Sequence, residues 1–243
     1  MSLGDIDTGA LVLLGLTLVV GATVQGLVGL GLGLVAAPVA MLLEPGLMPD
    51  LLLWLAMFLP VAMLAREHAE IDWPGLGWSL AARVPGTVVG VALVATFSTA
   101  SLGVAVAVIV LLSVLLTARA VVLPVTRATL VGAGFTSGIT GTASSIGGPP
   151  LTILLQHRSP RQIRTTLAVY FLVGGAMSLV GLAVGGRLEL HSFVVALLLA
   201  PCLFVGLGLA RALQGVVPSD RIRAVILVVC AASATVLLAR SVL

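Results

Sequence analysis

The chain has 243 residues, of which 60% are hydrophobic and 9% are charged, and its formal net charge is +3. Its mean hydropathy of +1.25 excludes an ordinary soluble domain and predicts an all-α polytopic membrane protein. All twelve basic residues are arginine, and they lie singly or in small groups beside apolar segments. In that position arginines orient a membrane protein, so the positive charge does not indicate nucleic-acid binding.

The apolar segments, taken in chain order, predict eight elements. The first is a broken helix over residues 8–43, and the loop after it contains Glu44 and Asp50. Spans are predicted at 51–65, 77–97 and 102–118, followed by a polar junction at 119–127. A second broken segment at 132–157 precedes spans at 165–185, 193–211 and 222–238, and His191 is expected in a loop. The chain thus divides into two four-segment halves, residues 1–123 and 124–243.

The second broken segment reads GAGFTSGITGTASSIGGPPLTILLQH and is unusually polar for its apolar surroundings. Pro149 and Pro150 supply no backbone N–H, and the glycines make helix propagation costly. In a bilayer, non-helical backbone is tolerated only where protein or a water-filled cavity satisfies its polar groups. We therefore expect two short helices joined by an unwound, hydroxyl-lined segment, an arrangement typical of transporter binding sites.

The first broken segment contains GATVQGLVGLGLGLVAAPVAMLL and aligns with the second at a constant offset of 112 residues. The matches are Gly26 with Gly138, Gly29 with Gly141, Pro38 with Pro150 and Leu42 with Leu154. Later matches at slightly larger offsets join Pro85 to Pro201 and Gly90 to Gly206. This repeat predicts two homologous halves.

The arginines favour one way of threading the two halves. If every segment spans the bilayer, the loop arginines divide almost evenly between the two sides, against the positive-inside tendency. If each broken segment is re-entrant, one side carries Arg66, Arg119, Arg127, Arg158, Arg161, Arg164, Arg211, Arg221 and Arg223, and the other only Arg187 and Arg240. Each half then crosses an odd number of times, which makes the halves inverted repeats. Against this, the first limb is nearly long enough to span.

The broken segments carry hydroxyls and glycines but almost no carboxylate or imidazole ligands, which predicts no metal site and no cofactor. Short helices beginning near Gly148 and Leu34 would direct their N-termini at the breaks, where exposed N–H groups favour an anion. Arg83, within the third span, either neutralises the anion or snorkels to the interface. The other candidate binding residues are Gln25, Gly26, Gly29, Gly31, Gly33, Ser137, Gly138, Thr140, Gly141, Thr142, Ser144, Ser145 and Gly148, with Pro38, Pro149 and Pro150 as helix-breaking residues.

The segments GLVGLGLGLVAAPVAMLL and SGITGTASSIGGPPLTILLQ, one opening each half, resemble the sulfite exporter TauE/SafE family, also called the 4-toluene sulfonate uptake permeases. The resemblance implies a non-enzymatic secondary transporter of sulfite, sulfoacetate, a sulfonate or a similar small anion in the bacterial inner membrane. The second break departs from the glycine pattern, because Ala143 and Ser145 align with Gly31 and Gly33.

Two other functions stay open at this point. An anion channel can also use re-entrant segments. An intramembrane hydrolase could use Ser137 with a histidine, although no G-x-S-x-G elbow is present. The coupling ion, the direction of transport and the oligomeric state are not specified by the sequence.

Overall fold

The computed structural model describes residues 7–119, 123–214 and 219–242, with the side chains of 219–226 outside the description. Every regular element in this part of the chain is helical, which confirms the all-α class. The helices are α1 Thr8–Val28, α2 Leu32–Leu43, the 3-10 helix η2 Pro45–Leu47, α3 Asp50–Leu64, α4 Trp73–Thr96, α5 Thr99–Ala118, α6 Arg127–Ser144, α7 Pro149–Leu155, α8 Pro160–Val184, α9 Leu190–Leu213 and α10 Ser219–Val242.

Five of these helices, α1, α4, α5, α8 and α9, are long and apolar enough to cross a membrane. Large apolar side chains face outward on them, among them Leu16 at 61% exposure, Val88 at 65% and Phe204 at 54%. An exterior of this kind is suited to lipid and not to water. The chain is therefore a multi-pass membrane protein, as predicted.

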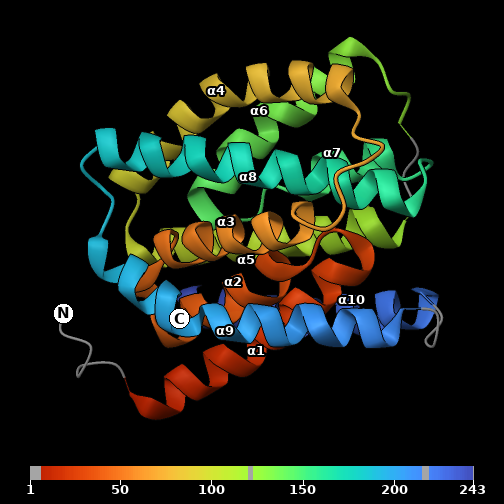
Figure 1. Ribbon diagram of the computed structural model, residues 1–243. Coiled ribbons are helices and arrows are strands. Elements are labelled where there is room, and N and C mark those ends of the chain that lie inside the picture. Colours follow the sequence, from red (N-terminus) through yellow and green to blue (C-terminus); the bar gives the residue numbers. More distant parts are fainter. Residues whose placement is uncertain (1–6, 120–122, 215–218, 243) are drawn as a thin grey trace.

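The helices pack in a regular order (Figure 1). α3 and α8 contact each other at the centre, α9 and then α1 lie beyond α3, and the tightly packed pair of α4 and α6 lies on the other side of α8. α5 pairs with α10, and the short helix α2 packs against both. Exchanging α1 with α6, α3 with α8, α4 with α9 and α5 with α10 reproduces this order of contacts.

One end of the bundle is rich in arginine. There the loop 65–72 is tied to the start of α8 by Glu67, whose carboxylate pairs with Arg161 at 2.8 Å and Arg164 at 3.2 Å. Glu70 in the same loop accepts a hydrogen bond from Ser159 at 2.9 Å. The described arginines near this end, called the arginine-rich end below, are Arg66, Arg119, Arg127, Arg158, Arg161, Arg164 and Arg211.

The opposite end joins the α8–α9 connection to the start of α3 and the end of α4. Arg187 donates to the carbonyl of Ala95 at 2.9 Å, and the N–H of Glu189 donates to Asp50 at 2.8 Å. α5 and α10 are antiparallel, because Gly103 near the start of α5 packs against Ser241 near the end of α10.

The chain reverses between α6 and α7. α6 runs parallel to α4, because Gly134 packs against Ser79 and Gly90 packs against Thr142 further along both helices. Both helices therefore begin at the arginine-rich end. α7 leads into residues 156–159, which lie at that same end through Ser159. The pair forms a hairpin that returns to the end where it started.

The chain also reverses between α1 and α2. α1 runs parallel to α9, since Gly15 packs against Cys202 and Gly26 against Ala210. Both begin at the end that holds Asp50, and α2 leads back to that residue. At about 1.5 Å per residue, α2 and α7 are roughly 18 and 10 Å long, too short to cross a bilayer. The re-entrant threading and the inverted halves remain predictions that fit these reversals.

The closest helix contact is between α4 and α6, and glycine makes it possible. A Cβ atom on Gly134 would overlap the backbone carbonyl of Ser79, and one on Gly138 would overlap the backbone of α4 at Arg83 and Thr87. Small residues allow this approach in membrane helices, where dispersion contacts and not water exclusion drive packing. The contact fixes α4, and with it Arg83, against the second hairpin.

Gly134→Ala should weaken this contact, because a methyl group forced into a filled space typically costs about 1–3 kcal/mol. Gly132→Ala is the matched control on the same helix, since a Cβ there meets no atom within 4 Å; it should be neutral or slightly stabilising through helix propensity. Thermal unfolding in detergent should show a lower Tm for the first variant only. Equal Tm values would contradict the packing.

A candidate anion site between two helix breaks

The first break lies at residues 29–31, between α1 and α2. Gly29 closes α1 with φ of 88°, and its N–H donates to the carbonyl of Gln25 at 2.8 Å. That left-handed conformation is readily available only to glycine. The side chain of Gln25 also satisfies a backbone group at the start of α2, because Gln25 Oε1 accepts the N–H of Leu32 at 3.2 Å.

The second break lies at residues 145–148, between α6 and α7. Ser145 closes α6 in the left-handed region with φ of 61°, where its N–H donates to the carbonyl of Gly141. A non-glycine residue held in this conformation is strained, so the surroundings must fix it. One such contact is the hydrogen bond from Ser145 Oγ to the carbonyl of Pro49 at 2.8 Å.

Both breaks are shorter than predicted. α6 stays helical through Ser144, so the hydroxyls expected in an unwound segment belong to a regular helix instead. Pro38 was predicted as a helix-breaking residue, but it lies inside α2. The preceding glycines already reverse the chain, and α2 tolerates the single N–H that proline removes. Pro149 and Pro150 do open α7, as expected.

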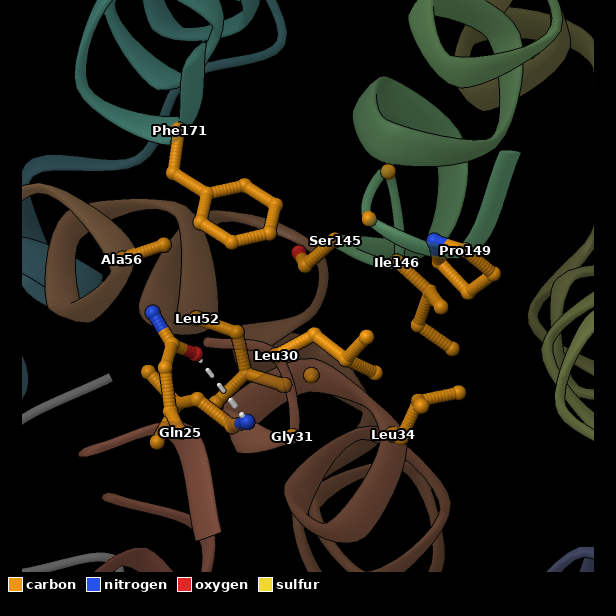
Figure 2. Close-up of a pocket in the computed structure, with 14 residues that line it drawn as sticks. Gln25, Leu30, Gly31, Leu34, Leu52, Ala56, Ser145, Ile146, Pro149 and Phe171 are labelled. Atoms are coloured by element: carbon orange, nitrogen blue, oxygen red, sulfur yellow. Dashed lines mark hydrogen bonds between the residues drawn. The ribbon is translucent and has the colours of Figure 1, made fainter. Parts of the chain in front are cut away.

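The two breaks meet at a small cavity of about 30 Å³ (Figure 2). It contains five of the predicted binding residues, Gln25, Gly31, Gly33, Ser145 and Gly148, together with the helix-breaking Pro149. Figure 2 shows Gln25, Ser145 and Phe171 approaching it from α1, the second break and α8. The remaining walls are Leu30, Leu32, Leu34, Leu52, Ala56, Ile146 and Gly147.

Arg83 lies directly behind the second break. Its side chain is 2% exposed, so the snorkelling alternative is wrong. Its Nη1 donates to Ser137 Oγ at 3.3 Å, and its guanidinium carbon lies 4.8 Å from the centre of the Tyr170 ring. The guanidinium lies against Gly147, a residue of the cavity wall.

This guanidinium has no acidic partner among the described residues. The ion pairs found there join only Glu67 to Arg161 and Arg164, and Arg83 Nε has no hydrogen-bond partner. Tyr170 provides a ring face, which attracts a cation but carries no net charge. Two neighbouring hydroxyl-bearing residues, Tyr170 and Thr87, also leave their oxygens without a partner. The site is positively charged, buried and incompletely hydrogen-bonded.

The other predicted residues serve the scaffold around the cavity. Ser137 Oγ donates to the carbonyl of Gly147, which links α6 to the break. Thr142 is hydrogen-bonded to Ser178 at 2.9 Å, and Ser144 donates to the carbonyl of Thr140 at 2.6 Å. Gly26, Gly138 and Gly141 lie at close contacts with Ala210, the α4 backbone and Arg83, respectively.

A larger cavity of about 350 Å³ adjoins the small one on its arginine-rich side. Leu30, Gly31, Leu34 and Pro149 line both cavities and so form the wall between them. We call the larger cavity the vestibule; its outer part includes Thr152, Gln156, Arg158 and Pro160. Its size lies within the range of small-molecule pockets. The opposite side of the small cavity is closed by α3 and α8.

The sequence analysis missed the apolar walls, namely Leu52 and Ala56 of α3 and Phe171 of α8. Nothing in their residue type separates them from any other buried apolar residue. The internal repeat is the only sequence signal that bears on them, because it predicts that α3 and α8 occupy equivalent places beside the two hairpins.

Comparison with known proteins agrees with this architecture. The sequence model described as "Sulfite exporter TauE/SafE" matches residues 13–237, nearly the whole chain. Neither the curated proteins nor the solved structures yield a match to it. The family comprises membrane transporters for sulfite and related anions and not enzymes. On the evidence of a match that covers both hairpins and all the long helices, the chain belongs to the sulfite exporter TauE/SafE family.

Proposed function

We propose that this protein is a secondary carrier of a small organosulfur anion, such as sulfite, sulfoacetate or a sulfonate, in the bacterial inner membrane. It works by alternating access, with the anion bound between the two breaks. The observation that carries the proposal is the buried guanidinium of Arg83, which has no carboxylate partner in the described chain and lies against the cavity wall at Gly147.

An uncompensated buried charge is costly, by several kcal/mol even after relaxation. A small anion bound in the central cavity, once that cavity widens to admit it, would offset this cost. Opposite charges attract strongly where water is excluded. Arginine also suits this role chemically, since its planar fork matches the paired oxygens of a sulfonate or sulfite as it does those of a phosphate or carboxylate. Further donors are available in the first turn of α2 at Gly33 and Leu34, where a helix start leaves N–H groups without helical acceptors.

The start of α7 offers an anion fewer N–H donors than the sequence analysis predicted. Its first two residues are Pro149 and Pro150, which have no N–H, and the helix is only 7 residues long. Charge at the second break therefore comes from Arg83. At the first break the equivalent position, 116 residues later, is the uncharged Leu199.

A carrier passes through states in which its central site is separated from the solution, and the two cavities fit such a state. The vestibule reaches inward from the arginine-rich end, the side expected to face the cytoplasm, and only the wall of Leu30, Gly31, Leu34 and Pro149 separates it from the centre. A pathway open at the other end follows if the two inverted halves exchange conformations. A channel would instead need a continuous pore, and the central cavity measures only about 30 Å³.

The hydrolase alternative gains no support from Ser137. The hydrogen-bond partners of its hydroxyl are the carbonyl of Gly147 and the guanidinium of Arg83. Neither group can take a proton from serine as a general base. Ser137 instead positions Arg83 behind the break.

Replacing Arg83 should separate binding from folding. Arg83→Met removes a buried charge without an ion-pair partner, so its Tm without anion should equal or exceed that of the wild type. The wild type should gain Tm with sulfite, sulfoacetate or methanesulfonate, since an anion at about 100 times Kd adds about 2.7 kcal/mol of stability. The variant should lose that gain, and exchange of labelled anion in proteoliposomes should stop.

Arg127→Met is the matched control, because Arg127 is exposed and stacks on Trp78 at 5.1 Å. It should keep both the anion-dependent Tm gain and exchange. A Tm gain that survives in Arg83→Met would place the anion elsewhere, and a wild type that responds to none of the three anions would reject the substrate class.

Two adjacent glycines of α8 test the geometry of the guanidinium. A Cβ on Gly174 would overlap the guanidinium of Arg83, whereas one on Gly175 would meet the flexible Met57 side chain at 3.3 Å and the Leu53 carbonyl at an ordinary contact distance of 3.8 Å. Gly174→Ala should therefore displace the charge and weaken the anion-dependent Tm gain, and Gly175→Ala should leave it near the wild-type value. Equal anion responses in isothermal calorimetry and thermal unfolding would contradict this placement.

A further inference from the structure

A second group of buried polar atoms lies far from Arg83, where α3 and α9 begin. Asp50 Oδ1, Trp54 Nε1, His191 Nε2 and Ser192 Oγ are all buried and have no hydrogen-bond partner. The N–H of Glu189 joins the two helices by donating to Asp50 Oδ2 at 2.8 Å. We call Asp50, Trp54, His191 and Ser192 the acid–histidine cluster. Native proteins leave few buried polar groups unsatisfied, so each of these four calls for an explanation.

The cluster contains a carboxyl group and an imidazole. Asp50 is only 4% exposed, at the end of the bundle just before the apolar run of α3, and therefore outside the segment that crosses the membrane. His191 is not in a loop, as its sequence position suggested, but in the first turn of α9, where it is partly exposed. His191 follows Glu189, whose N–H is bonded to Asp50, by two residues, so the chain holds it near the acid.

The charged groups around Asp50 do not compensate it. On the elements packed against it they are Glu44, Arg187, Glu189 and His191. Arg187 is exposed and engaged elsewhere, with a backbone carbonyl, and no ion pair to Asp50 exists in the described chain. The pKa of Asp50 is raised to about 6, mainly by burial; the hydrogen bond from the Glu189 N–H lowers it, and the charge of Glu189 raises it by a smaller amount.

The repeat shows that packing alone does not require an acid here. The corresponding contact, with the roles of the two halves exchanged, runs from the N–H of Asp72, before α4, to Thr166 Oγ1 at 3.1 Å. Thr166 follows Asp50 by 116 residues, close to the offset that relates Asp72 to Glu189. A hydroxyl therefore makes the same connection to a helix start. The carboxyl group of Asp50 adds a group that can titrate.

The cluster is also connected to the central cavity. Asp50 follows Pro49, whose carbonyl accepts the hydrogen bond of Ser145 in the second break. Further along that break, Gly147 accepts from Ser137, which in turn accepts from Arg83. One residue and one hydrogen bond therefore separate Asp50 from the strained residue Ser145 at the break.

We propose that the acid–histidine cluster is a proton-binding site, in which Asp50 exchanges a proton with the aqueous side through His191 and so couples anion transport to a proton gradient. In the transfer an N–H bond of the imidazolium breaks, an O–H bond forms at Asp50 Oδ1, and water returns a proton to the histidine. The proposal rests on the carrier function proposed above, for which it supplies the coupling ion.

The test uses Asp50→Thr, which copies the residue found at Thr166 and keeps a hydrogen-bond acceptor while removing the titratable group. Glu44→Gln is the control, because it removes a carboxylate near the same end of the bundle. Proteoliposomes would be assayed with labelled sulfoacetate and methanesulfonate, first for exchange at equal pH and then for accumulation driven by a pH gradient. Asp50→Thr should retain exchange and lose at least about tenfold in gradient-driven accumulation, within the usual range of coupling energies.

Gradient-driven accumulation by Asp50→Thr at the level of Glu44→Gln would overturn the proposal, and so would wild-type exchange that ignores the pH gradient while still moving anion. A wild type that exchanges neither probe would instead reject the carrier function for these anions. His191→Gln supports the test from a second position, because it should slow gradient-driven accumulation while exchange continues.

A readout without any anion tests proton binding itself. Asp50 has a folded-state pKa of about 6 against an ordinary value of 3.8, so between these values the folded state binds more protons than the unfolded state. Its contribution to stability is present below pH 3.8 and is lost as the pH rises through 6. The Tm of the wild type and of Glu44→Gln should fall across that interval by more than that of Asp50→Thr. Parallel Tm curves for all three proteins would overturn the proton site.

Discussion

A guanidinium group buried between helices without a carboxylate is the constraint on which the rest of the site depends. The glycines at 141, 147 and 174 leave room for the guanidinium. Ser137 accepts one hydrogen bond from it, and the Tyr170 ring covers one of its faces. These contacts orient the charge without neutralising it. The glycine contact between α4 and α6 then holds it behind the second break, so the close packing of two helices sets the electrostatic character of the cavity.

The sequence predicted the broad architecture because its signals are long and redundant. Apolar runs of about 20 residues define membrane helices almost regardless of detail, and the paired glycine and proline elements located both hairpins. The predicted helix ends were wrong where one local effect on the backbone had to be weighed against another. The glycine- and serine-rich part of the second broken segment was expected to unwind. Instead α6 continues to Ser144, because its tight contacts with α4 stabilise a regular helix. Pro38 likewise costs α2 one hydrogen bond without ending it.

Side-chain roles were harder to predict, for a physical reason. Whether an arginine within a span snorkels or remains inside depends on what packs around it, and the residues that enclose Arg83 come from α6, the second break and α8. None of them is near in sequence. The same is true of Asp50 and His191, which look like ordinary loop residues until the α8–α9 connection folds over the start of α3. The hydroxyls, which dominated the sequence argument, instead proved to bond mainly within and between helices.

Symmetry in the backbone and asymmetry in the charges together suggest how such a fold can perform directional work. The order of helix contacts is similar in the two halves, so we expect two related conformations of comparable energy. The charged residues break that equivalence, because Arg83 corresponds to Leu199 and Asp50 corresponds to Thr166. An anion near Arg83 and a proton on Asp50 would therefore each interact with a residue that has no counterpart in the other half. This matters because a ligand shifts a two-state equilibrium only by its differential affinity for the two states. Arg83 lies against residues 145–148 at Gly147, and Pro49, the residue before Asp50, accepts a hydrogen bond from Ser145 of the same segment. That segment is therefore the element whose equilibrium the two ions would bias in common, which is the physical requirement for coupling between sites.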